Sequence, residues 1–345
     1  MTETDNLDGQ KVNINSYGQG LQRHLIFTLI RLSSKYTDKR IERKKDFNPD
    51  FVLLLFEEPE AFLHPTQQEI LNINLHTLAS EENQQVIITT HSPTFASRNL
   101  EDIESIIRLD KSDAITFTYQ LNSNALSELF DENLSMFKFF SEKSVDLAVP
   151  ERIRNKIIHD NLGDPNADLC KKLEQESIKY FLWLDAERSA LFFAKHVIIC
   201  EGATEKVLLN HIVDNRWPCL KEKHIYFLDA MGKYGIHRYM NLFKHLGISH
   251  SVLIDSDQDR DVHALVNNFI CSNKNSFTIG IHAFERDLEA FLEFPRAPRG
   301  DLKPVHALDC YKRGMINDEK LGELYDIISS FLCYQQSDNI GLAEG

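Results

Sequence analysis

Short apolar runs separated by amphipathic stretches recur along this 345-residue chain. The first run, Phe51–Phe56, is followed by a helical pattern over about 66–80 and by a second run at Val86–Ile88. A continuous apolar run is typical of a buried strand, and the order strand, helix, strand predicts a parallel βαβ unit. A closing strand pair is expected at Ile103–Leu109 and Ile115–Leu121.

The pattern becomes mainly helical between about residues 123 and 190 and then returns to alternation. A turn-rich segment at 161–166 divides the helical region. The second alternation predicts strands at 196–200, 225–228, 251–254 and 277–281, with helices over 203–215 and 235–246. Two such alternations predict an α/β protein whose second half is a doubly wound parallel sheet.

The composition is that of an ordinary globular protein, with 42% apolar and 26% charged residues. The length allows two domains with substantial cores. The sequence has no basic-then-apolar leader and no apolar run of about 18 residues. Its six cysteines form no C-x-x-C pair, so we expect a soluble cytoplasmic protein without membrane contact, disulfide framework or zinc site. The net charge of -14 argues against a generally basic surface but leaves room for a local basic groove.

Acidic residues follow the first apolar run in the stretch FVLLLFEEPEAFLHP, residues 51–65. Ligands of a parallel sheet bind beyond the carboxyl ends of its strands. We expect Glu57 to hold a water on a nucleotide-bound magnesium ion, and Glu58 to activate the attacking water. His91, just after the second run, is placed to sense the terminal phosphate. The alternative is an acidic surface turn with a capping histidine, which Pro59 also fits.

A glycine-containing loop, INSYGQGLQRH, lies immediately before a predicted helix over 21–36. The exposed N–H groups and the dipole at the start of a helix favour an anion. The loop is therefore a candidate phosphate contact, through Ser16, Gly18 and Gly20. A two-glycine loop is a weak signal when it is taken alone.

The order of this loop, the E-E-P-E acids, Leu63-His64-Pro65 and T-T-H-S-P resembles the C-terminal half of an ATP-binding-cassette ATPase of the SMC-like kind. The resemblance implies a signature motif, which adds Gln22 to the nucleotide-contacting residues, together with Walker B acids, a D-loop and a switch histidine. The sequence contains no G-x-x-x-x-G-K-S/T phosphate loop, and its G-K pair, Gly232-Lys233, lacks the first glycine of that motif. ATP is therefore expected as a cofactor only if a partner supplies a P-loop in trans.

Carboxylates also end two strands of the second alternation. HVIICEGATEKVLL places Glu201 at the end of an apolar run and Glu205 four residues later, on the same side of the following helix. SVLIDSDQDRD places Asp255 and Asp257 on one side of an extended chain. Oxygen ligands from two strand ends suit Mg²⁺ or Mn²⁺, as a two-metal site for phosphodiester hydrolysis. An EF-hand calcium loop lacks its glycine and glutamate here; a simple helix-start acid remains the alternative for Glu201.

The E-G-x-x-E strand end followed by D-x-D resembles the Toprim domain of topoisomerases, primases and nucleases over about residues 193–300. The resemblance implies metal ligands at Glu201, Asp255 and Asp257, and an additional nuclease-type ligand at Glu205.

Two further residues complete the predicted site. Glu289 in HAFERDLEAFL is the preferred further metal ligand, with Asp287 second. A lysine is needed to neutralise charge that builds up on the phosphate, and Lys303 in LKPVHAL is the candidate. A solvated loop lysine is an equal alternative for Lys303.

Together the two constellations resemble the OLD (overcoming lysogenisation defect) family of ATP-dependent endonucleases, from Ser16 to about Leu308. The resemblance implies the C-terminal half of an ABC-type ATPase domain at 1–122, a helical linker at 123–192, a Toprim domain at 193–308 and a C-terminal helical extension at 309–345.

The resemblance also implies an activity and partners. It implies a divalent-metal-dependent DNA endonuclease that forms homodimers, often acts in phage defence, and is regulated by its ATPase module. The alternative is a non-catalytic or truncated subunit whose ATPase tail completes a nucleotide site on a P-loop-bearing partner. A primase or topoisomerase is a third class, although no tyrosine in the sequence has a context that would mark it as a nucleophile.

Overall fold

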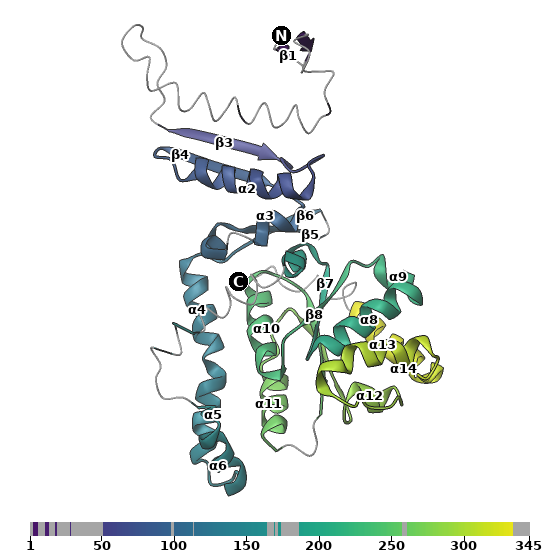
Figure 1. The fold of residues 1–345 in the computed structure, drawn as a ribbon. Helices are drawn as coiled ribbons and strands as arrows, with labels where there is room; N and C mark the ends of the chain where they lie inside the picture. The colour runs from purple at the N-terminus through teal and green to yellow at the C-terminus, as the bar shows by residue number, and fades with distance from the viewer. Residues whose placement is uncertain are drawn as a thin grey trace. The chain divides into compact units, whose positions relative to one another are not determined.

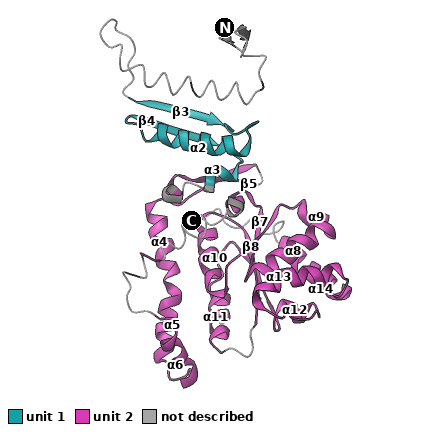
Figure 2. Cartoon of the chain, viewed as in Figure 1, with its two compact units in different colours: residues 1–98 teal, residues 99–345 magenta. Residues whose placement is uncertain are grey.

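The computed structural model describes residues 3–5, 11–13, 18, 28, 51–97, 100–112, 114–163, 169, 172–173, 186–256 and 261–333. The chain divides into two compact units, residues 1–98 and residues 99–345 (Figure 2). Four predicted site residues lie outside the described residues: Ser16, Gly20, Gln22 and Asp257.

The first unit contains the predicted βαβ element. Strands β3 (Val52–Glu57) and β4 (Gln84–Thr89) pair in parallel, and α2 (Pro65–Ala79) connects them (Figure 1). The short helix α3 (Pro93–Ser97) follows β4. A small antiparallel pair, β1 (Glu3–Asp5) with β2 (Lys11–Asn13), belongs to the same unit.

Burial alternates along β3 and β4. One face packs on α2 and α3 through an apolar cluster of Leu54, Phe56, Val86, Ile88, Leu71, Leu75, Leu78 and Phe95. The opposite face leaves Leu53, Leu55 and Ile87 46%, 68% and 45% exposed. The predicted strand is therefore present, and in the described residues only the face that α2 and α3 cover is buried.

The second unit begins with a 3-10 helix, η2 (Leu100–Ser105), and a hairpin of β5 (Ile107–Ser112) and β6 (Ile115–Gln120). The predicted strand start at Ile103 is wrong. Acids at three of the six positions of Leu-Glu-Asp-Ile-Glu-Ser give that segment no alternating apolar side.

A parallel sheet forms the centre of the second unit. Its strands in the described residues are β7 (His196–Cys200), β8 (Ile225–Asp229), β9 (His250–Asp255) and β10 (Thr278–Phe284), in the order β10-β9-β7-β8. The connecting helices are α8 (Ala203–Asn215), α10 (Ile236–His245) and α11 (Asp261–Ser272). The predicted strands and helices are thus confirmed to within a few residues, and the fold class is α/β.

Helices cover both faces of this sheet (Figure 1). One side carries α8, α13 (Lys303–Lys312) and α14 (Asp318–Cys333), with the short helices α9 (Pro218–Lys221) and α12 (Leu288–Phe291) nearby. The other side carries α10 and α11. Helix α14 belongs to the core: Leu324, Ile328 and Phe331 share one apolar cluster with Ile198 of β7, although the segment was predicted as an extension beyond the Toprim domain.

Three helices of the predicted linker pack against α10 and α11. They are α4 (Ser123–Asn133), α5 (Ser135–Val145) and α6 (Glu151–His159). The side-chain amide of Asn241 in α10 donates to Oδ1 of Asn133 in α4 at 2.9 Å. The ring centroid of Phe139 in α5 lies 5.1 Å from that of Phe269 in α11. The end of α6 at His159 agrees with the turn-rich break predicted just after it.

The β5–β6 hairpin packs at the amino ends of the parallel strands. The buried guanidinium of Arg108 donates to the carbonyls of Phe192, Leu246 and Gly247, which precede β7 and β9. A Cβ atom at Gly247 would lie 2.2 Å from the ring of Tyr119, so only glycine fits there. The hairpin therefore does not cover the carboxyl ends of the strands, which form the edge where ligands bind in this class of sheet.

None of the described helices is long and apolar enough to cross a membrane.

Two buried histidines make the stability of the second unit depend on pH. Burial lowers the pKa of His196 to about 3, with His250 as a further cause, and lowers the pKa of His250 to about 4. Each stays neutral in the fold, while the unfolded chain takes up protons below about pH 6.5. The resulting stability is present above pH 6.5 and is lost as pH falls toward 4, by at most about 1.4 kcal/mol per pH unit for each histidine.

We expect His250→Gln to make this pH dependence shallower. The measurement is denaturant unfolding of the full chain at pH 7, 6 and 5, followed by tryptophan fluorescence, to which Trp217, buried in the second unit, contributes. His159→Gln is the control, because the side chain of His159 is 87% exposed. An unchanged slope in His250→Gln would contradict the assignment.

Candidate metal centre

The site of interest lies where the strand order of the sheet reverses. Strands β7 and β9 are neighbours, but the chain leaves β7 toward β8 on one side and leaves β9 toward β10 on the other. This is a topological switch point, and loops diverge there to leave a crevice at the carboxyl edge. Glu201 directly follows β7, and Asp255 is the last residue of β9. The structure thus brings these two predicted ligands to adjacent strand ends.

Hydrogen bonds tie the carboxylates to the two strand ends. The backbone N–H of Asp255 donates to Glu201 Oε2 at 3.4 Å. Glu205, in the first turn of α8, accepts from the N–H of Gly202 at 3.1 Å and is 8% exposed. The acid at the third helical position therefore caps its own helix, as in a capping box.

Burial and mutual repulsion raise the pKa values of these acids. The pKa of Asp255 rises to about 8, first through burial and then through Glu205, Glu201, Glu289 and Asp287. The pKa of Glu205 rises to about 7, first through burial and then through Glu201 and Glu289. Several carboxylates thus share one poorly solvated region, an arrangement that calls for a cation.

Two helices that follow β10 contribute Glu289 and Lys303. Glu289, in α12, is 5% exposed, and the Nζ atom of Lys303 lies 3.7 Å from its Oε1. Lys303 begins α13, and its side chain is 52% exposed. Asp287, the second choice as a ligand, is engaged otherwise: it caps α12 through the N–H of Ala290 at 2.7 Å and pairs with Arg296.

Lys233 is a member of this cluster that the sequence reasoning missed. Its Nζ atom donates to the carbonyl of Asp255 at 2.6 Å and lies 3.5 Å from Glu201 Oε2. The Gly232-Lys233 pair was noticed only as a failed phosphate-loop match. Its place in the loop after a predicted strand, at the same edge as the acids, was the signal that could have found it.

The donor set fits a hard divalent cation. Carboxylate oxygens are the preferred ligands of Mg²⁺ and Mn²⁺, and clustered acids with raised pKa values gain charge compensation when such an ion binds. Glu201, Asp255, Glu205 and Glu289 would hold the ion among the described residues, and Asp257 remains a predicted ligand.

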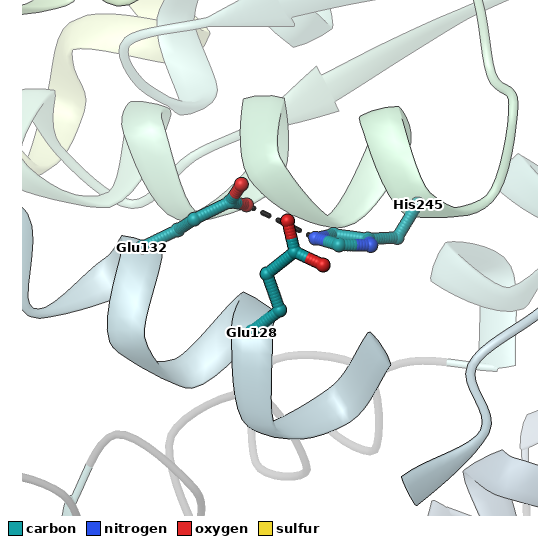
Figure 3. Close-up of side chains that lie close together, drawn as sticks. All are labelled: Glu128, Glu132 and His245. Carbon is teal, nitrogen blue, oxygen red and sulfur yellow. Dashed lines mark hydrogen bonds and ion pairs between the residues drawn. The ribbon is translucent and has the colours of Figure 1, made fainter. Parts of the chain in front are cut away.

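A second cluster has closer spacing but a different character. Ligand atoms of Glu128, Glu132 and His245 all lie within 4.8 Å of one another, and Figure 3 shows them between α4 and α10. Lys244 pairs with Glu132 and lies 3.9 Å from Glu128. Together with the pair between His245 and Glu132, these contacts join α4 to α10. Although burial alone would raise the pKa of Glu132, hydrogen bonds from His245 and Lys244 lower it.

The first unit brings together part of the predicted nucleotide site. Glu57 pairs in register with Thr89, and a carboxylate oxygen of Glu58 lies 3.5 Å from Nε2 of His91. Glu60, to which no role was assigned, accepts hydrogen bonds from the hydroxyl of Thr90 and, at 3.1 Å, from the N–H of His91. Glu60 therefore holds the turn after β3 against the loop after β4.

Two other residues of the predicted nucleotide site are described: His64 is the N-cap of α2, and Gly18 is exposed. Nδ1 of His64 accepts from the backbone N–H of Thr66, and the backbone N–H of His64 donates to the side chain of Gln67. The two bonds form a capping box. Gly18 is the part of the predicted signature loop that the structure describes.

Comparison with known proteins bears on both units. Residues 192–257 match the family described as overcoming lysogenization defect protein-like, TOPRIM domain, and residues 1–96 match the AAA ATPase domain family. The chain is thus similar to overcoming-lysogenization-defect proteins over residues 192–257 and to AAA ATPase domains over residues 1–96. These matches confirm two predictions from the sequence: the family resemblance that the motifs carry, and the α/β fold class. The roles of the individual site residues stay predictions.

Three relatives carry this relationship. Endonuclease GajA of Bacillus cereus is 26% identical over 258 residues, which is 72% of this chain and 32% of that protein. The OLD nuclease of Thermus scotoductus is 25% identical over 209 residues, 59% of this chain and 30% of that protein. The Old nuclease of Escherichia phage P2 is 30% identical over 140 residues, 38% of this chain and 23% of that protein. The chain spans at most about a third of the length of these relatives.

Proposed function

We propose that this chain is a divalent-metal-dependent DNA endonuclease of the OLD type. The observation that carries the proposal is the group of carboxylates at the switch point, with Glu201 and Asp255 on adjacent strand ends and Glu205 and Glu289 within electrostatic reach. The names of the relatives, which are nucleases, supply the substrate class. Mg²⁺ or Mn²⁺ is the proposed cofactor, and a homodimer acting on DNA the proposed assembly.

The chemistry divides between the ion and the chain. A divalent cation supplies positive charge that polarises a phosphodiester and acidifies water. Glu201 and Asp255 fix the place where that charge is held, because each is attached to the end of a buried strand. Asp257 would complete the ligand set.

Lys303 is proposed to act on the phosphate itself. It is half-exposed and lies beside Glu289, so it can reach both the acidic cluster and a substrate that enters from solvent. A fixed ammonium group there would stabilise charge that develops on the phosphate oxygens in the transition state.

We expect Asp255→Asn to reduce Mg²⁺- or Mn²⁺-dependent cleavage of plasmid DNA by about 100-fold or more, since it removes one charge from the ligand set. Cleavage is measured by conversion of supercoiled plasmid on a gel. Glu285→Gln is the matched control, because Glu285 follows β10 at the same edge but is exposed. An inactive wild-type chain, or an Asp255→Asn variant as active as wild type, would overturn the nuclease proposal.

We expect Lys303→Ala to lower the cleavage rate at saturating metal by about 10²–10³-fold, the cost of losing one preorganised transition-state contact. Lys312→Ala serves as control on the same helix, since Lys312 lies in its last turn and is exposed. Equal rates for the two variants would show that Lys303 is a solvated lysine.

A second candidate function concerns the first unit. A parallel sheet is normally covered on both faces, yet Leu53, Leu55 and Ile87 are exposed on one face of β3–β4 in the described residues. We propose that further polypeptide covers this face and supplies the P-loop absent from the sequence. The unit would then contribute Glu58 and His91 to an ATP site that regulates the nuclease.

This candidate predicts that the purified chain alone hydrolyses no ATP, because it has no P-loop lysine for the β and γ phosphates. Turnover is measured as phosphate release with and without an added P-loop-bearing ATPase segment. Turnover that appears on mixing, and is lost again with Glu58→Gln, is the expected result. Turnover by the chain alone that survives Glu58→Gln would count against the assignment.

A further inference from the structure

The buried lysine of the candidate metal centre has no part in the function proposed so far. The side chain of Lys233 is 1% exposed, whereas that of Lys303 is 52% exposed. A substrate that enters from solvent can meet Lys303, but a lysine this deeply buried cannot be a general phosphate contact. Groups that contact its Nζ atom include the carbonyl of Asp255 at 2.6 Å and Glu201 Oε2 at 3.5 Å.

The loop between β8 and α10 is shaped to deliver this side chain. The N–H of Gly232 donates to the carbonyl of Glu201 at 2.8 Å, which fastens the loop to the end of β7. Gly232 has φ +110°, a conformation that favours glycine. Gly235 then passes so close to Ala230 that a Cβ atom would lie 2.4 Å from its carbonyl oxygen. From this loop Lys233 reaches across β7 to the end of β9.

Burying a lysine is costly unless its charge is compensated. Burying several carboxylates together is costly for the same reason, and repulsion among them adds to the cost. Lys233 reduces both costs at once, because its ammonium group lies beside Glu201 inside the cluster that also contains Glu205 and Asp255.

We propose that Lys233 is a positioning residue that acts as the built-in counter-charge of the metal centre. In the metal-free chain, its ammonium group compensates Glu201 and its hydrogen bond to the carbonyl of Asp255 holds the carboxyl end of β9. This inference rests on the proposed function, in that it assumes a divalent cation at this edge.

A counter-charge of this kind competes with the metal. It stabilises the metal-free chain more than the metal-bound chain, because the ion and the ammonium group repel each other. By thermodynamic linkage, removal of the lysine charge must then strengthen metal binding while it weakens the metal-free fold. If Lys233 had only a packing role, its replacement would destabilise the metal-free and metal-bound chains equally and leave the metal affinity unchanged.

The experiment compares the full wild-type chain with Lys233→Gln, which removes the charge and keeps an N–H donor, and with Lys233→Met. Mn²⁺ binding is measured by calorimetric titration, and thermal unfolding is followed with and without Mn²⁺. We expect Lys233→Gln to bind Mn²⁺ about 5-fold or more tightly than wild type. Its unfolding temperature should fall more without Mn²⁺ than with it.

Three further variants assign the effect. Lys223→Gln, at an exposed position, and Lys233→Arg, which keeps the charge, should bind Mn²⁺ as wild type does. Adding Asp255→Asn to Lys233→Gln should abolish the gain in affinity, which separates this edge from the Glu128, Glu132 and His245 cluster.

Unchanged or weaker Mn²⁺ binding by Lys233→Gln overturns the proposal, as does absence of binding in both proteins. If the neutral variants are unfolded without metal, refolding on addition of Mn²⁺ supports the proposal and failure to refold overturns it. None of these measurements uses DNA cleavage. A wild-type chain that binds Mn²⁺ but cleaves no DNA would therefore refute the nuclease proposal and still leave the role of Lys233 decided.

Discussion

Repulsion among buried carboxylates at the carboxyl edge of one parallel sheet is the constraint that organises the second unit. Burial raises the pKa of Asp255, and repulsion from Glu205, Glu201 and Glu289 adds to the shift, which brings the pKa to about 8. Such a group persists in a fold only when rigid elements hold it and positive charge compensates it. Buried strands supply the rigidity, and Lys233 supplies charge from within.

The rest of the unit keeps that edge available. Helices pack on both faces of the sheet, and the β5–β6 hairpin is fastened by Arg108 to the carbonyls of Phe192, Leu246 and Gly247 at the opposite edge. The carboxyl ends of β7 and β9 are thus not covered by the hairpin, and they carry the acidic side chains of the candidate metal centre. The predicted linker helices and the C-terminal helix α14 pack with this unit, which makes the sheet the centre of a larger body than residues 193–308.

The first unit combines fastened polar loops with an exposed apolar sheet face. Its turn after β3 and its loop after β4 are fastened to each other by Glu60, and Glu58 meets His91. One apolar face of β3–β4 nevertheless remains exposed in the described residues. These organised polar groups beside an exposed apolar face are the basis for the proposal that further polypeptide covers this sheet.

The sequence by itself determined the strands, the helices and most of the acids of the site. Apolar runs such as His196–Cys200 identify buried strands, and an acid directly after such a run lies at the carboxyl edge wherever strands are parallel. Tertiary structure alone decided the partners. No local pattern reports that Lys233 crosses β7 to reach Asp255, because strand order depends on packing between distant segments. For the same reason the sequence could rank Glu289 above Asp287 only by pattern, whereas the fold shows Asp287 engaged as a helix cap.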